Sequence, residues 1–380
     1  MIAQLEDRLM VRQHSGNLRQ LHVTKNLIDF ASNDYLGLAR SPDLAFSIIK
    51  EWENCQKPFN GCGSTGSRLL TGNSAYVEEL ENHLADFHGY KAGLIFNCGY
   101  MANLGLLSSV ISREDIIFYD TAVHASMHDG ISLSYALAYP FRHNDLFHLE
   151  QRLNNIQSKG QRFICIESIY STDGSKAPLQ EICHLSKLYN AHLIVDEAHA
   201  SGIWGPCGRG LVAEHGLKQQ VFAQITTFGK AWGAFGAIIL GSQQLKQMMI
   251  NFSRSFIYTT ALPFHVLAAI KSSCELMPAL EKQRDRLKQL ILHYQKVSPS
   301  SSETQIQCIK IRGNGSVKDV ATKLALEGFD VRPLRSPTVK RGHELLRICL
   351  HAFNTEEQIS RLVERIKYHH ETQRTINLPI

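Results

Sequence analysis

The chain has 380 residues, of which 44% are hydrophobic and 20% charged, and its formal net charge is +5. These values are typical of a globular protein with a full-sized core and, by length, two or three domains. The longest apolar runs, such as Ala237–Leu240, are far shorter than the ~20 residues that span a bilayer. No run of lysine and arginine is long enough to indicate a nucleic-acid-binding protein.

The amino-terminal region and the cysteines favour a cytoplasmic protein. Glu6 and Asp7 lie where a secretory signal requires an uncharged apolar segment, so no signal peptide is expected. The nine cysteines form no Cys-x-x-Cys pair, which favours buried free thiols in a reducing compartment. They are Cys55, Cys62, Cys98, Cys165, Cys183, Cys207, Cys274, Cys308 and Cys349. No metal site is expected, because the histidines lack a ligand spacing.

An amphipathic segment (Leu5, Leu9, Val11) opens the chain and leads to a short strand predicted over residues 27–30. After a turn at residues 33–37, a helix is predicted from apolar residues spaced by three and four positions: Val77, Leu80, Leu84 and Phe87. Six strands are then predicted, over Gly93–Phe96, Ile116–Tyr119, Phe163–Ile166, His192–Val195, Ile225–Phe228 and Ala237–Leu240. Helices are predicted over Tyr100–Val110, Leu179–Tyr189 and Gln243–Phe252. This alternation favours an α/β fold with a mostly parallel sheet covered on both faces.

The pattern changes near Pro263. A long helical segment is predicted to run to about Tyr294, and a strand-helix-strand-strand-helix unit closes the chain. We therefore predict an amino-terminal segment, residues 1–40, that packs with a small domain, and a large α/β domain, residues 41–262. Residues 263–380 are predicted to form a linking helix and the small α+β domain.

An acid ends one of the predicted strands, in the run Asp196-Glu197-Ala198-His199. The carboxyl ends of parallel strands are where open α/β sheets bind ligands. The same letters mark the magnesium-binding strand of DEAH-type helicases, which also requires a G-x-x-x-x-G-K-[ST] phosphate loop. The only Gly-Lys pair, Gly229-Lys230, is followed by Ala231, so an ATPase is not predicted. An acid that merely caps the next turn is the remaining alternative.

A single lysine, Lys230, follows another strand end. Taken alone, such a lysine is usually a surface charge, but its combination with Asp196 indicates a pyridoxal-phosphate site. The lysine must be partly desolvated to be a neutral amine that can form an imine. The acid must keep the pyridine nitrogen protonated, so that the ring can accept electrons from a carbanion.

The cofactor's phosphate requires backbone N–H groups and hydroxyls. The turn Asn97-Cys98-Gly99-Tyr100 joins a strand to a helix and suits this role. Further hydroxyls near the cofactor are expected from Ser171, Thr227, Thr259 and Thr260.

Two further residues fit such a site. His124 follows a strand and could lie over the flat cofactor, although an isolated histidine is more often a structural hydrogen-bonding residue. Arg347 interrupts an apolar strand and could pair bidentately with a substrate carboxylate. A structural salt bridge explains Arg347 equally well from the sequence.

From Asn33 to Phe353 the motifs, in order, resemble those of the α-oxoamine synthases, a family of pyridoxal-phosphate enzymes. The motifs are Asn33–Leu38, Gly63–Asn73, Asn97–Asn103, His124–Ser126, Glu167–Gly174, Asp196–His199, Thr227–Lys230, Pro337–Val339 and Leu346–Ile348. The resemblance implies fold type I, the aminotransferase-like fold. In that fold a large, mostly parallel sheet of the seven-stranded type accompanies a smaller carboxyl-terminal α+β domain. It also implies a homodimer with shared active sites.

The resemblance also implies a role for each candidate residue. For the catalytic set these are Lys230 as the Schiff-base lysine, Asp196 as the pyridinium partner, His199 at the ring hydroxyl, and His124 stacked on the ring beside the substrate. For the rest of the cofactor they are Ser171 at the ring hydroxyl, Gly99, Tyr100 and Thr227 on the phosphate side, and Thr259 and Thr260 donated across the dimer interface. For the substrate they are Arg347 at the amino-acid carboxylate, with Arg19 and Thr338.

Within the family, the run Ser67–Asn73 is most similar to the biotin-pathway members, which join L-alanine to a pimeloyl thioester carried on CoA or acyl carrier protein. Members that use glycine with acetyl- or succinyl-CoA, or serine with a long acyl-CoA, remain alternatives, as do an aminotransferase and a non-catalytic homologue. The chain departs from the usual pattern in three places. Ala200-Ser201-Gly202 replaces Gly-Thr-Gly, Thr172 replaces a frequent methionine, and Trp232 follows the lysine.

Overall fold

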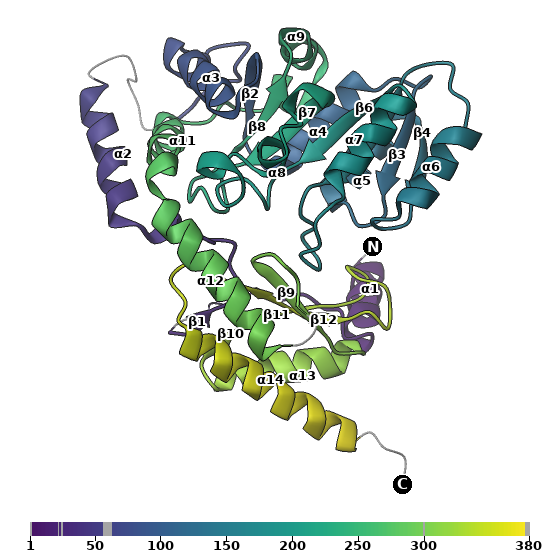
Figure 1. Cartoon of the computed structure of the whole chain (residues 1–380), viewed down its shortest axis with the longest axis vertical. Coiled ribbons are helices and arrows are strands. Elements are labelled where there is room, and N and C mark those ends of the chain that lie inside the picture. Colours follow the sequence, from purple (N-terminus) through teal and green to yellow (C-terminus); the bar gives the residue numbers. More distant parts are fainter. Residues whose placement is uncertain (1, 22, 24–25, 56–62, 299–300, 377–380) are drawn as a thin grey trace. The chain divides into compact units, whose positions relative to one another are not determined.

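The computed structural model describes residues 2–21, 23, 26–55, 63–298 and 301–376, and Figure 1 draws their helices and strands. The chain forms two compact units. The first, which we call the sheet unit, contains residues 36–171 and 176–284; the second, the terminal unit, contains residues 1–35, 172–175 and 285–380. The domain boundaries that the sequence predicts, after residues 40 and 262, stay a prediction.

In the described residues, the sheet unit is built on a seven-stranded sheet with the strand order β2-β8-β7-β6-β5-β3-β4. β8 runs antiparallel to its neighbours β2 and β7, and the other pairs are parallel. The strands are β2 Ala92–Phe96, β3 Ile116–Asp120, β4 Leu137–Phe141, β5 Arg162–Glu167, β6 Ala191–Asp196, β7 Val221–Thr227 and β8 Ala237–Gly241. The predicted α/β class with a mostly parallel sheet is confirmed.

The six strands predicted in this region are present, with ends shifted by a few residues, but the seventh was not predicted. β4 lies at the edge of the sheet, where it pairs only with β3. It contains Pro140, which cannot donate to a strand ladder and so occurs at edges. Its residues Leu-Ala-Tyr-Pro-Phe are apolar but mostly half-exposed, unlike the buried residues of the central strands.

Helices pack around this sheet (Figure 1). They are α2 Pro42–Asn54, α3 Ala75–His88, α4 Gly99–Val110, α5 Ala125–Ser134, α6 Leu146–Asn155, α7 Leu179–Leu188, α8 Leu211–Glu214, α9 Gln243–Phe252, α10 Arg254–Ile257 and α11 Phe264–Leu276. The prediction of one long helix from Pro263 to Tyr294 is wrong. α11 ends at Leu276, a 3-10 turn covers Met277–Ala279, and α12 runs over Glu281–Val297. Pro278 lies in that turn and lacks the N–H that a continuous helix requires.

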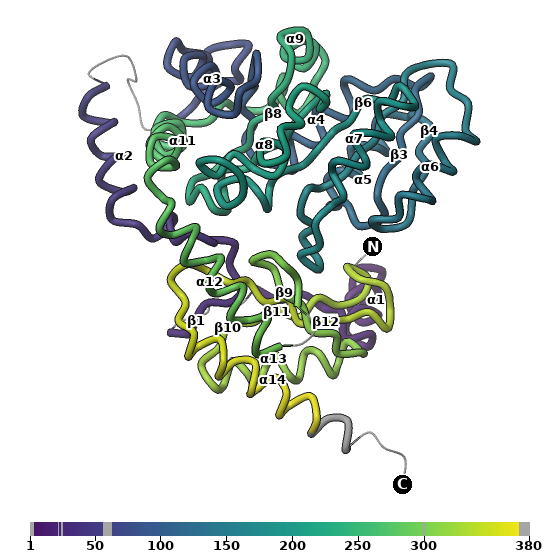
Figure 2. The backbone as a smooth tube through the Cα atoms, viewed as in Figure 1, coloured from purple at the N-terminus to yellow at the C-terminus, as the bar shows by residue number. Residues whose placement is uncertain are grey.

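The terminal unit joins the two ends of the chain (Figure 2). β1 Ile28–Asp29 pairs in parallel with β10 Phe329–Asp330, about three hundred residues later. A second, antiparallel sheet has the order β11-β12-β9, from β9 Ile306–Lys310, β11 Arg332–Leu334 and β12 Leu345–Cys349. The helices are α1 Ile2–His14, α12 from residue 285 onward, α13 Asn314–Leu326 and α14 Glu356–Ile376. The prediction lacked β10, whose two residues pair with a distant segment.

None of the described cysteines forms a disulfide. Four are buried, namely Cys165, Cys183, Cys274 and Cys349, whereas Cys55, Cys98, Cys207 and Cys308 are half-buried; Cys62 lies outside the described residues. Among the described residues, no group of three His, Cys, Asp or Glu side chains is arranged to hold a metal ion. In the same part of the chain, no helix combines the length and the apolar character needed to cross a membrane.

Candidate functional site

Three neighbouring parallel strands deliver polar residues to one edge of the sheet. β5 ends at Glu167 and β6 at Asp196, and these two residues are register partners. On β7, Ile225 is the register partner of Asp196, and Thr227 ends the strand. Because carboxyl ends of parallel strands meet at the same edge, the sheet itself brings together an acid pair and a hydroxyl.

Lys230 follows β7 by three residues and contacts His199. Its Nζ lies 2.8 Å from His199 Nε2, and His199 belongs to the turn that follows β6. The lysine is half-buried and the imidazole is buried, which partly desolvates the amine. The two residues that the sequence assigned separately to the lysine and the ring-hydroxyl positions are therefore direct neighbours.

Asp196 is held in a buried hydrogen-bond chain. The Nδ2 of Asn103 donates to Asp196 Oδ2 at 2.8 Å and to Ser126 Oγ at 3.0 Å, and the backbone N–H of Ala198 donates to Asp196 Oδ1 at 2.9 Å. Ser126 Oγ in turn lies 2.8 Å from His124 Nδ1. The chain fixes the direction of the Asp196 carboxylate and links it to His124, since Asn103, Ser126 and Asp196 are all buried.

His124 caps the amino-terminal end of α5. Its Nδ1 accepts the backbone N–H of Ser126 at 3.2 Å, which assigns the ring proton to Nε2. The side chain remains partly exposed, yet desolvation of the ring and the charge of Lys230 lower its pKa, against the opposing effect of Asp196. The imidazole is therefore neutral near pH 7, which suits a ring that packs against a flat heterocycle.

The start of α4 lies beside the end of β7, and we call this place the anion-binding corner for the role that we expect of it. Gly99 is the first residue of α4, and Cys98 at the N-cap makes no side-chain cap hydrogen bond to the helix. A Cβ on Gly99 would lie 2.6 Å from Thr227 Cγ2, so only glycine fits there. The Oγ1 of Thr227 is buried and has no hydrogen-bond partner in the described protein. A helix amino-terminus with an unsatisfied buried hydroxyl fits a phosphate group.

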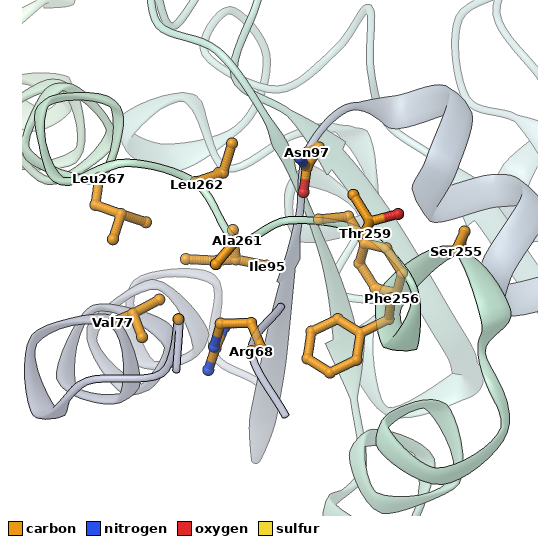
Figure 3. Close-up of a pocket in the computed structure, with 12 residues that line it drawn as sticks. Arg68, Val77, Ile95, Asn97, Ser255, Phe256, Thr259, Ala261, Leu262 and Leu267 are labelled. Atoms are coloured by element: carbon orange, nitrogen blue, oxygen red, sulfur yellow. The ribbon is translucent and has the colours of Figure 1, made fainter. Parts of the chain in front are cut away.

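The other residues expected around the phosphate lie further out. Tyr100 is 40% exposed, and its hydroxyl donates to Asp129. Thr259 lines a pocket with Asn97 and Arg68 (Figure 3). The backbone oxygen of Thr260 accepts Asn97 Nδ2 at 3.0 Å, and its side chain is exposed. Within one chain these threonines border the turn at residues 97–100, and their expected role across a dimer interface stays a prediction.

Glu167 was not singled out by the sequence, although it opens one of the motifs. Its carboxylate accepts the backbone N–H of Ser171 at 3.3 Å and is also stabilised by the backbone N–H of His124. It is therefore hydrogen-bonded to the backbones of two candidate cofactor residues. Burial raises its pKa to about 8, helped by the adjacent charge of Asp196.

Glu197 is a second buried acid next to Asp196. Val212 donates its backbone N–H to Glu197 Oε1 at 3.2 Å, and burial raises the Glu197 pKa to about 8. Two protonated carboxyl groups thus flank Asp196 near pH 7. Protonation of these two neighbours limits like-charge repulsion around Asp196.

The substrate candidates Arg19, Thr338 and Arg347 lie in the terminal unit. Arg347, on β12, donates to Asn33 Oδ1 at 3.1 Å and lies 3.5 Å from the hydroxyl of Tyr35 and 3.0 Å from Cys349 Sγ. Arg19 Nη2 donates to Thr338 Oγ1 at 3.3 Å, and both side chains are exposed. The last contact joins two of the three residues that the sequence grouped by resemblance, whereas the contacts given for Arg347 are with Asn33, Tyr35 and Cys349.

Four residues of these clusters were missed as individual site residues: Asn33, Asn103, Ser126 and Glu167. Each lies inside a motif that the sequence analysis quotes. A helical signal for Asn103 was present, because it lies four residues after Gly99 and therefore on the same face of α4. No local pattern could have paired Asn33 with Arg347, which are 314 positions apart.

The class of protein follows from this sheet, this site and the family profile for aminotransferase class I and II, which matches residues 25–366. The chain therefore belongs to the aminotransferase class I and II family. It is 38% identical, over 364 residues, to the 8-amino-7-oxononanoate synthase of Emericella nidulans, covering 89% of this chain and 88% of the relative. The resemblance to α-oxoamine synthases is thereby confirmed.

Solved structures agree with this assignment. A structure of 8-amino-7-oxononanoate synthase from Francisella tularensis superposes with a TM-score of 0.78 at 28% identity, covering 92% of this chain and 99% of that one. A serine palmitoyltransferase from Sphingomonas wittichii superposes with a TM-score of 0.86 at 25% identity, covering 98% of both chains. The expected fold type I is confirmed by these neighbours.

Proposed function

We propose that the chain catalyses the decarboxylative condensation of L-alanine with a pimeloyl thioester, using pyridoxal 5'-phosphate. The products are 8-amino-7-oxononanoate, CO2 and the free thiol of CoA or acyl carrier protein, as in biotin biosynthesis. The observation that carries the proposal is the 38% identity to an 8-amino-7-oxononanoate synthase across 89% of the chain. The contact between Lys230 and His199 beside the Asp196 network supplies the matching chemistry.

The residues at the sheet edge fit pyridoxal phosphate. The unsatisfied Thr227 hydroxyl and the Gly99 backbone at the start of α4 would hold its phosphate. Asp196 would hold a proton at the ring nitrogen, His199 and Ser171 would bind the ring hydroxyl, and His124 would pack on the ring. When bound, the cofactor supplies a conjugated ring that delocalises the negative charge left at the substrate Cα.

Lys230 has two tasks in this proposal. It would hold the cofactor, and once alanine has taken its place, its amine would remove the Cα proton as general base. The Cα then bonds to the thioester carbonyl carbon and the thiolate leaves, taking a proton. The alanine carboxyl leaves as CO2, and a proton returned to Cα completes the aminoketone. His199, at 2.8 Å from the amine, would orient it throughout.

Arg347 would bind the alanine carboxylate, with Arg19 and Thr338 on the acyl side. The contacts from Asn33 and Tyr35 fix the guanidinium direction before any substrate arrives, which reduces the ordering cost of binding. We further propose a cytoplasmic homodimer, in which Thr259 and Thr260 serve the partner's site.

A second candidate is another α-oxoamine synthase reaction, with serine or glycine in place of alanine. It is favoured by the likeness to serine palmitoyltransferase structures, at a TM-score of 0.86 and 25% identity. Sequence identity favours the alanine reaction, since the relative at 38% carries that name.

Amino-acid-dependent thiol release from pimeloyl-CoA tests the proposal. Purified protein loaded with pyridoxal phosphate is given alanine, glycine or serine, and free thiol is measured. We expect alanine to give the highest kcat/KM. Faster release with glycine or serine would move the protein to another branch of the family, and amino-group transfer without thiol release would indicate an aminotransferase.

A further inference from the structure

Two departures from the family pattern meet in the structure. The indole N–H of Trp232 donates to Ser201 Oγ at 2.9 Å. Both side chains are buried, at 0% and 1% exposure, so this bond is shielded from water. An indole N–H buried without an acceptor is costly, and Ser201 supplies the acceptor.

The bond joins the two turns that carry the lysine and the histidine of the proposed site. Ser201 lies two residues after His199, and Trp232 lies two residues after Lys230. A second contact reinforces the first, because a Cβ on Gly202 would lie 2.7 Å from the Cβ of Ala231. The turns therefore touch at two points behind the 2.8 Å contact between Lys230 and His199.

Trp232 is itself fixed by its surroundings. Its ring makes an edge contact with Phe228 at 5.1 Å between centroids and stacks on His88 at 5.8 Å. Burial lowers the His88 pKa to about 3, so that ring is neutral and adds no charge beside the lysine turn. Ser273 Oγ donates to the backbone oxygen of Trp232 at 2.6 Å. These contacts fix the position of the indole, and its N–H in turn fixes the position of Ser201.

We infer that Ser201 and Trp232 are positioning residues, which lock the turn of His199 to the turn of Lys230 and so set the distance between imidazole and amine. This inference rests on the proposed function, in which those two side chains act at the cofactor. The pair acts only through its neighbours, and it does not contact the reacting atoms.

Hydrogen–deuterium exchange on the full-length protein, with and without pyridoxal phosphate, tests the link. The reporters for the His199 turn are the backbone N–H groups of Ser201 and Gly202, which donate to Glu197 O and Gly208 O. Those for the Lys230 turn are the N–H groups of Gly233 and Ala234, which donate to Lys230 O and Phe228 O. Ser201→Ala should speed exchange at Gly233 and Ala234, and Trp232→Phe should speed it at Ser201 and Gly202. We expect about fivefold in each case, the size of one lost neutral hydrogen bond.

The kcat and the KM for alanine of the same variants provide a second test. Each variant should lower kcat about fivefold and leave the KM for alanine unchanged, and the double variant should be no slower than either single one, because both remove the same bond. Ser201→Thr keeps the hydroxyl and should behave like the unmodified protein. Ser186→Ala is the matched control, since Ser186 is also buried and its hydroxyl donates within α7, to Cys183 O at 2.9 Å.

Exchange that rises only in the mutated turn, or additive losses of kcat, would overturn the inference, as would Ser201→Thr behaving like Ser201→Ala. The exchange measurement requires no turnover. If the proposed reaction is not observed but each substitution still speeds exchange in the opposite turn, the inferred contact between the turns holds. If the reaction is observed but exchange in the opposite turn does not change, only the inferred contact is wrong.

Discussion

The cofactor cluster of the sheet unit and the arginine cluster of the terminal unit are built in different ways. At the sheet edge, Glu167, Asp196 and Thr227 end three adjacent strands. Asn103 and Ser126 connect Asp196 to His124 through hydrogen bonds. Arg347 instead rests on Asn33 and Tyr35, from the opposite end of the chain, and Arg19 and Thr338 are exposed.

The different construction of the two clusters suggests that one determines the type of reaction and the other the choice of substrate. A rigid sheet edge with a closed hydrogen-bond chain holds its groups in one geometry, as proton transfer and charge delocalisation require. A cluster that includes exposed side chains can change its ligand with few substitutions. We therefore expect the family's common chemistry to depend on the first cluster and the choice of amino acid and acyl group on the second.

The largest expected effect belongs to the sheet edge. Lys230→Ala should abolish the visible absorbance of bound cofactor and lower kcat by about 10³-fold or more, because it removes the general base and the attachment point. Absorbance and thiol release measure both. Lys187→Ala, at an exposed position of α7, is the control and should change neither. Appreciable turnover by Lys230→Ala would contradict the mechanism.

Arg347→Ala should act on the other cluster alone. We expect the KM for alanine to rise about 10- to 100-fold, the loss of a charged hydrogen-bonded contact, with cofactor absorbance unchanged. Arg332→Ala is a matched control, since Arg332 is the register partner of Arg347 on β11 and pairs with Asp330 at 3.0 Å. If Arg332→Ala raised the KM as much, the carboxylate role would not belong to Arg347.

Gly99→Ala tests the anion-binding corner. The added Cβ would lie 2.6 Å from Thr227 Cγ2, so we expect the Kd for pyridoxal phosphate to rise about tenfold through overpacking. Gly315→Ala, where no atom lies within 4 Å of the added Cβ, should leave the Kd unchanged. Equal affinity in the two variants would place the phosphate elsewhere.

The smallest effect is a pH dependence of stability. Glu167 keeps its proton up to about pH 8 in the folded protein, whereas an exposed glutamate loses it near 4.5. The folded state thus binds the extra proton, and the stability that Glu167 contributes is lost as pH rises from about 4.5 to about 8. Glu167→Gln should flatten that slope and raise Tm by about 2–4 °C at pH 8.5. Glu181→Gln, at an exposed site, should not change the dependence of stability on pH. An unchanged dependence in Glu167→Gln would mean that the Glu167 carboxyl is ionised in the folded protein.

The sheet edge was largely predictable from sequence, and the reason is local. Strands β5 and β6 are mostly apolar up to the acid that ends each of them, and parallel order brings their ends to the same edge as the end of β7. The strand pattern therefore predicted that Asp196 and Lys230 belong to one edge of the sheet. The spacing from Gly99 placed Asn103 on the correct face of α4, but its hydrogen bond to Ser126 could not be predicted, because a bond between two helices leaves no pattern in the sequence of either helix. β10 was missed because its two residues pair with a strand about three hundred residues away. The break at Pro278 was missed because a single residue interrupts a long helical pattern.

The most direct test of the central claim follows the carboxyl carbon of alanine. The protein, loaded with pyridoxal phosphate, is given L-alanine labelled with ¹³C at the carboxyl group and pimeloyl-CoA, and gas and products are analysed by mass spectrometry. The proposed reaction releases the label as CO2, in a 1:1 ratio with free CoA, and gives unlabelled 8-amino-7-oxononanoate. Label retained in a keto acid, with CoA still acylated, would contradict it.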